Sequence, residues 1–207
     1  VSTAMVESLL PLITYCSVMF STPGPNNVML ATSGANFGFR RTVPHLLGIN
    51  FSAFALTLVA CLGLGTVFTK YPALHSWMKV VGATYLVYLA WRLAWARVTR
   101  VVGASKPLTF LEGLAFQLVN PKGWMRVVTV ATVFMPPSMN VVHAALLVSG
   151  VGFVLGVQFN SVWALFGAGI GRILGSPLHL RVFNVAMGLS LLGLAAALLL
   201  QLGQSGR

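Results

Sequence analysis

The chain has 207 residues, of which 57% are hydrophobic and 7% are charged, and its mean hydropathy is +0.87. Soluble proteins carry about 25% charged residues, so this composition excludes a soluble globular domain and predicts an integral membrane protein. The formal net charge of +11 does not indicate a nucleic-acid partner, because the basic residues lie at the ends of apolar runs rather than in one patch.

Apolar runs separated by basic or Pro/Gly segments predict about six transmembrane helices, since one span needs roughly 20 apolar residues. The runs lie near residues 5–34, 43–68, 72–95, 108–135, 141–170 and 180–202. We therefore expect an all-α membrane protein with a single transmembrane transporter domain over residues 1–207. Equal division of the spans predicts two inverted three-helix repeats, the first half about 1–100 and the second half about 106–207.

The N-terminal run has no basic segment before it, and we interpret it as the first membrane helix rather than as a cleaved signal peptide. Basic residues are concentrated in the odd-numbered loops between the predicted spans. They are Arg40, Arg41, Arg92, Arg97, Arg100, Lys106, Arg172 and Arg181. The positive-inside rule therefore predicts that these loops are cytoplasmic and that both termini lie outside, in a multi-pass protein of the bacterial inner membrane.

The first run is interrupted by Pro23-Gly24-Pro25-Asn26-Asn27. Each proline removes a backbone donor and obstructs the preceding turn, so an ordinary helix cannot continue here. We expect a half-helix that begins near Asn26 and Asn27 to bind a substrate carboxylate. Carbonyl oxygens around Pro23 and Gly24 are then expected to bind the substrate ammonium group. The alternative is a kink that serves helix packing alone.

The fourth run is interrupted by Asn120-Pro121-Lys122-Gly123, which corresponds in position to the first break if the chain is a two-repeat transporter. Paired breaks of this kind indicate a binding site near the bilayer midplane. A cation such as Lys122 within an apolar run costs about 2.5–3.5 kcal/mol unless it is paired or hydrated. We predict that Lys122 holds the substrate carboxylate. The alternative for Lys122, and for Arg126, is that the side chain extends to the membrane interface.

Acidic residues are scarce, since Glu7 and Glu112 are the only two in the sequence. This scarcity disfavours a cationic substrate and favours a neutral or acidic amino acid. Glu112 and Lys122 are the candidates for carrying a coupled proton. The alternative for Glu112 is a capping charge near the start of the fourth span.

Two polar residues of the fifth span, Gln158 and Asn160, would be penalised by lipid, so at least part of this cluster is expected to face the bundle interior. We interpret both as candidate substrate contacts. The alternative, which is equally consistent with the pattern, is that they form hydrogen bonds between helices.

The glycine pairs Gly152/Gly156 and Gly167/Gly171 have the small-xxx-small spacing of closely packed membrane helices, either within one bundle or between copies in a homo-oligomer. Motifs for nucleophilic catalysis, zinc hydrolysis and nucleotide binding do not occur in the sequence. We therefore expect neither an enzyme nor an ATP-driven pump, and no cofactor or metal. The expected partners are a small amino-acid substrate and the lipid bilayer, without nucleic acid.

The Pro23–Asn27 motif and several residues after it resemble the N-terminal signature of the LysE/RhtB family of amino-acid exporters. The later residues of that signature are Gly34, Gly38, Phe39, Arg40 and Gly48. Gly82–Leu86 before Trp91, and Phe116–Lys122, resemble the third and fourth segments of the family. The forms of the first and last of these motifs look closest to the cysteine/O-acetylserine exporter branch.

This resemblance implies a secondary-active exporter that is driven by the proton-motive force. Its expected substrates are small neutral amino acids or derivatives, of the cysteine/O-acetylserine or threonine/homoserine kind. The alternative function is a passive channel or a non-transporting membrane subunit, in which the broken helices serve packing only.

Overall fold

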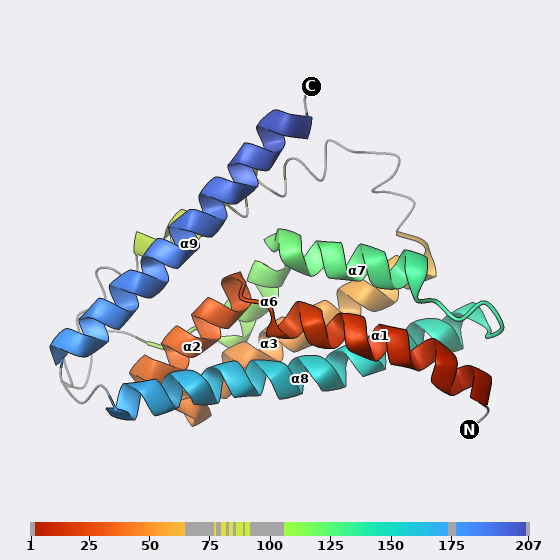
Figure 1. The fold of residues 1–207 in the computed structure, drawn as a ribbon, viewed down its shortest axis with the longest axis horizontal. Coiled ribbons are helices and arrows are strands. Elements are labelled where there is room, and N and C mark those ends of the chain that lie inside the picture. The colour runs from red at the N-terminus through yellow and green to blue at the C-terminus, as the bar shows by residue number, and fades with distance from the viewer. Residues whose placement is uncertain are drawn as a thin grey trace.

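The computed structural model describes residues 3–64, 106–173 and 177–205, together with isolated positions between 77 and 91. Within these ranges the regular elements are all helices, and none of the described residues forms a strand (Figure 1). The elements in chain order are α1 (Thr3–Ser21), α2 (Pro25–Phe37), α3 (Phe39–Val59), the short π-helical segment η1 (Ala60–Leu64), α6 (Phe110–Val119), α7 (Pro121–Val133), α8 (Val141–Ile173) and α9 (Pro177–Ser205).

Both predicted interruptions are true breaks in the helices. The first separates α1 from α2, and Pro25 is the first residue of α2. The second separates α6 from α7 at Asn120, whose backbone is extended (φ −79°, ψ 106°), and Pro121 is the first residue of α7. Proline suits a first helical position because the N–H that it lacks would have no helical partner there. The residue before a proline is disfavoured in the helical region, so each preceding helix ends.

A third junction lies at Gly38, where α2 passes into α3 without a loop. Gly38 has a positive φ of +80°, and its N–H donates to the carbonyl of Gly34 at 2.8 Å. Glycine adopts this conformation without the strain that a Cβ would introduce. As a result α3 begins at Phe39, earlier than the expected start near residue 43.

Close packing of α2 against α8 forms the centre of the described bundle. The two helices lie side by side in Figure 1, with α1 continuing along the other part of α8. A Cβ on Gly167 would lie 1.9 Å from the carbonyl oxygen of Ala31, and a Cβ on Gly171 would lie 2.2 Å from that of Ala35. These distances confirm that the Gly167/Gly171 spacing serves close helix packing, which here occurs within one chain.

Polar side chains also join the helices inside the bundle. Asn36 of α2 and Asn184 of α9 exchange two amide hydrogen bonds, of 2.8 and 3.0 Å. Ser33 and Thr42 form a buried hydrogen bond of 2.8 Å between α2 and α3. Such pairs satisfy polar groups that lipid cannot solvate, and they fix the rotation of each helix about its axis.

Two helices within the described residues are long and apolar enough to cross a membrane, Phe39–Gly63 and Val141–Gly171. Shorter apolar helices cover Leu9–Ser21, Phe110–Val119 and Arg181–Ala196. Large apolar side chains such as Leu111 and Val133 point outward from the bundle, as lipid-facing residues do. Most of the predicted third span, 72–95, lies outside the described residues, so the six-span inverted repeat stays a prediction.

Candidate functional site

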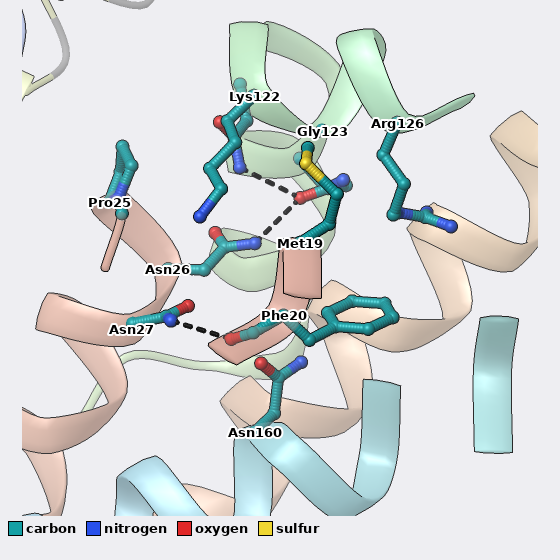
Figure 2. Close-up of a pocket in the computed structure, with 12 residues that line it drawn as sticks. Met19, Phe20, Pro25, Asn26, Asn27, Lys122, Gly123, Arg126 and Asn160 are labelled. Atoms are coloured by element: carbon teal, nitrogen blue, oxygen red, sulfur yellow. Dashed lines mark hydrogen bonds between the residues drawn. The ribbon is translucent and has the colours of Figure 1, made fainter. Parts of the chain in front are cut away.

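A small pocket lies where the two helix breaks meet (Figure 2). Its lining residues are Met19, Phe20, Gly24, Pro25, Asn26, Asn27, Gln117, Asn120, Lys122, Gly123, Arg126 and Asn160. The pocket is partly open, and its volume of about 30 Å³ is enough for about two water molecules. The tertiary structure therefore brings together segments about a hundred residues apart in the chain, as the paired breaks predicted.

Asn27 holds the first break in shape. Its amide Nδ2 donates to the carbonyl oxygens of Phe20, at 2.9 Å, and Thr22, at 3.1 Å. The carbonyl of Phe20 belongs to the last turn of α1 and that of Thr22 directly follows the helix, where helical hydrogen bonding stops. The side chain thus ties the start of α2 to the end of α1, and it acts on the site through these two carbonyls.

Gln117 connects the two breaks. Its Oε1 accepts hydrogen bonds from Nδ2 of Asn26, at 3.0 Å, and from Nδ2 of Asn120, at 3.2 Å (Figure 2). A Cβ on Gly123 would lie 2.2 Å from Nε2 of Gln117, so only glycine leaves room for this arrangement. Gln117 is a site residue that the sequence motifs did not predict, although a glutamine inside an apolar run is a signal for one.

The amide network leaves two oxygen atoms available to a ligand. Oδ1 of Asn26 and Oδ1 of Asn120 are buried, and neither accepts a hydrogen bond from any described residue. Their amide nitrogens are engaged by Gln117, which sets the direction of both oxygens. Buried acceptors without partners are costly, and a ligand with several N–H donors would satisfy them.

Lys122 extends from the start of α7 toward the first break (Figure 2). Its Nζ donates to the carbonyl oxygen of Thr22 and, at 3.3 Å, to that of Pro23. These carbonyls are among those that the sequence analysis assigned to the substrate ammonium group. The lysine is therefore directed at the oxygen-rich side of the pocket, whereas its position in an apolar run predicted that it holds the substrate carboxylate. The reason is that α1 ends beside α7, so the carbonyls that follow the last residue of α1 are the nearest acceptors of the lysine.

Arg126 lies inside the bundle, since only 4% of its surface is exposed. The interpretation that it extends to the membrane interface is therefore wrong. Its guanidinium carbon lies 5.2 Å from the centre of the Phe20 ring, and Nη2 lies 3.5 Å from Oγ1 of Thr57. No carboxylate contacts it among the described side chains. A buried cation without a carboxylate beside it would bind an anion strongly.

Glu112 lies away from the pocket and caps α6. Its Oε2 accepts from the N–H of Thr109 at 2.7 Å, and its own N–H donates to Oγ1 of Thr109 at 3.2 Å. This reciprocal pair is a capping box. The interpretation of Glu112 as a capping charge is confirmed, and a role in proton coupling stays a prediction.

The two polar residues of α8 differ in position. Asn160 is buried, lines the pocket and donates to Oδ1 of Asn50 at 3.3 Å, so it combines an interhelical hydrogen bond with a place in the site. Gln158 is exposed and does not line this pocket. Two residues along a helix are rotated by about 200°, so both side chains cannot face the interior.

The remaining predicted residues are the prolines. Pro25 lines the pocket, whereas Pro23 is exposed and contributes its carbonyl oxygen to Lys122. Pro121 is buried at the start of α7 but does not line the pocket. Their effect on the site is to end one helix and begin the next.

This geometry agrees with what the chain resembles in sequence. The family model described as LysE type translocator matches residues 17–202, which include both breaks and every residue of the pocket. The chain belongs to the LysE type translocator family. Family membership confirms the resemblance found in the sequence, and a translocator agrees with the expectation that the protein is not an enzyme.

Curated relatives of this translocator cover nearly the whole chain. The cysteine/O-acetylserine efflux protein of Escherichia coli (strain K12) is 29% identical over 179 residues, which are 86% of this chain and 90% of the relative. A protein of the same name from Escherichia coli O139:H28 (strain E24377A / ETEC) is 29% identical over 180 residues, or 86% of this chain and 91% of the relative. No solved structure matches this chain.

Proposed function

We propose that this translocator exports small neutral amino acids or their derivatives, of the cysteine/O-acetylserine or threonine/homoserine kind, from the bacterial cytoplasm. The proton-motive force drives the export, and the substrate binds in the pocket between the two helix breaks. The efflux function named for the relatives supports the direction and the class of substrate.

The observation that carries this proposal is that one side of the pocket favours an anion and the other side favours a cation. On one side lies the buried guanidinium of Arg126, which has no acidic partner among the described side chains. On the other side lie the unpartnered oxygens of Asn26 and Asn120. A free amino acid carries a carboxylate and an ammonium group on one carbon atom, so it complements both sides at once.

The half-helices add to this separation. α2 and α7 begin at the pocket, and neither has a side-chain cap at its N-terminus. Their first N–H groups and positive dipole ends favour the substrate carboxylate. α1 ends at the pocket, and the carbonyls at this negative end of its dipole favour the ammonium group. Rocking of one half of the protein against the other would then expose the site to each side of the membrane in turn.

The lining also supports a neutral side chain on the substrate, since no Asp or Glu occurs among the pocket residues. A lysine or arginine substrate would bring a second cation into a site without a carboxylate for it. Burying that unpaired charge costs on the order of several kcal/mol.

An efflux assay tests the proposal directly. Cells that overproduce cysteine, O-acetylserine, threonine, homoserine or lysine are compared with and without the protein, and the purified protein is then placed in proteoliposomes. We expect export of at least one neutral amino acid and none of lysine. We also expect accumulation against a gradient only when a pH gradient or potential is imposed. Equalisation of concentrations without such a force would identify a passive channel instead.

Substitution of Asn27 tests whether the first break forms the site. Asn27→Ala removes two hydrogen bonds, each worth about 1 kcal/mol, from the carbonyls of Phe20 and Thr22. The side-chain donors that remain are Trp163 for Phe20 and Lys122 for Thr22. Export is expected to fall about tenfold or more, while the amount of protein in the membrane is unchanged. The matched control is Asn140→Ala, which removes an exposed asparagine that caps α8. Equal export by the two variants would contradict this role of Asn27.

The orientation of the protein is part of the proposal, with both termini on the periplasmic side of the inner membrane. Alkaline phosphatase is active only in the periplasm, whereas green fluorescent protein fused to an exported C-terminus does not fluoresce. We expect the C-terminal phosphatase fusion to be active and the fluorescent fusion to be dark. The reverse pattern would overturn the orientation.

A further inference from the structure

The side chain of Lys122 fills space that a bound amino acid would need. It lies against the backbone of Gly24, where a Cβ would approach Cδ of the lysine to 2.8 Å and Nζ to 3.1 Å. Its ammonium group donates to the carbonyls of Thr22 and Pro23. Thus a primary ammonium ion already occupies the oxygen-rich side of the pocket, and it belongs to the protein itself.

The carbonyls that hold Lys122 suit any primary ammonium group. Those of Thr22 and Pro23 directly follow the last residue of α1, Ser21, so they lie at the negative end of the helix dipole. A substrate α-ammonium group would have the same charge, the same number of donors and the same preference for these oxygens. Two such cations repel each other and cannot share one pair of carbonyls.

We propose that Lys122 is a tethered competitor, which occupies the ammonium subsite of the empty transporter and is displaced when the amino acid binds. This inference rests on the proposed function. Its consequence concerns the step in which the carrier, after releasing substrate outside, reorients empty toward the cytoplasm. Without Lys122, the carbonyl of Pro23 has no donor among the described residues when substrate has left, and that of Thr22 keeps only Nδ2 of Asn27. Unpaired backbone groups within a membrane are strongly unfavourable. The empty carrier then reorients slowly, whereas the loaded carrier is unaffected.

Gly24 supplies a second, independent way to remove the competitor. Its backbone is extended, with φ −167° and ψ 177°, a conformation that alanine also adopts. The Cβ of Gly24→Ala would displace the lysine side chain, whose flexible end can move away without changing the helices. This variant therefore frees the subsite while the charge of Lys122 stays in the protein.

The test separates net efflux from exchange in proteoliposomes, with whichever of cysteine, O-acetylserine, threonine and homoserine the wild type exports fastest. Net efflux into amino-acid-free buffer requires the empty carrier to return, whereas exchange of labelled for unlabelled amino acid does not. For Lys122→Met we expect net efflux to fall about tenfold or more, since the carbonyl of Pro23 loses its donor and that of Thr22 loses one of two donors in the empty state. Exchange should keep more than about half of its wild-type rate, because reorientation of the loaded carrier does not involve the freed carbonyls.

Gly24→Ala should likewise lower net efflux more than exchange. The control is Lys106→Met, which removes an exposed lysine before α6 and should change neither rate.

The possible outcomes are distinct. Equal loss of efflux and exchange in Lys122→Met would make the lysine a direct substrate ligand and would overturn the inference, as would unchanged net efflux. If Lys122→Met does not fold, as judged by size-exclusion chromatography, Gly24→Ala decides between the same outcomes. If the wild type performs neither efflux nor exchange, the proposed function itself fails.

Discussion

Gly167→Val is expected to force α2 away from α8 and to prevent recovery of folded protein. A Cβ at this position would lie 1.9 Å from the carbonyl oxygen and 2.6 Å from the carbonyl carbon of Ala31. These are backbone atoms of a helix, so no side-chain rotation relieves the overlap. Overpacking a core lowers the free energy of unfolding by about 1–3 kcal/mol. Because the overlap here is with backbone atoms, we expect a loss at or above the upper end of this range.

Fluorescence-detected size-exclusion chromatography in detergent measures the effect, together with the temperature at which the monodisperse peak is lost. Gly169→Val is the matched control, because a Cβ on Gly169 meets no atom within 4 Å and the change in helix propensity is the same. Equal recovery and equal thermal stability of the two variants would contradict the close contact between α2 and α8.

Arg126→Met is expected to reduce export by about 10- to 100-fold without destabilising the protein. A charge-assisted hydrogen bond to the substrate carboxylate is worth about 1.5–3 kcal/mol, and 1.4 kcal/mol corresponds to a factor of ten. Thermal stability is expected to stay the same or to rise in Arg126→Met, while export falls. Arg126 is buried without an acidic partner among the described side chains, and replacing a buried charge by an apolar side chain of similar length is often neutral or stabilising.

Export rates and thermal denaturation in detergent are measured on the same preparations. Arg126→Lys keeps the charge but loses the planar pair of donors, so its export rate should lie between those of the wild type and Arg126→Met. Arg181→Met removes an exposed arginine of α9 and should leave export nearly unchanged. If Arg126→Met were to unfold at a lower temperature and export at the wild-type rate, the guanidinium would have a structural role only.

The helix breaks could be predicted from the sequence because their cause is local. A proline disturbs the residue before it and its own hydrogen bond, whatever the rest of the chain does. For this reason α1 ends two residues before Pro23 and α6 ends two residues before Pro121, while Pro25 and Pro121 begin α2 and α7. The close packing of Gly167 could be predicted in the same way, since the small-residue spacing lies on one helix.

The directions of the long polar side chains could not be predicted, because they depend on residues far away in the chain. The sequence determined that Lys122 and Arg126 are cations within an apolar run, but not which groups they would meet. Only the tertiary structure brings the end of α1 to Lys122 and encloses Arg126 beside Phe20. Likewise, the rotation of α8 buries Asn160 and exposes Gln158. Local backbone chemistry thus determines where the helices stop, whereas packing between distant helices decides which polar groups form the site.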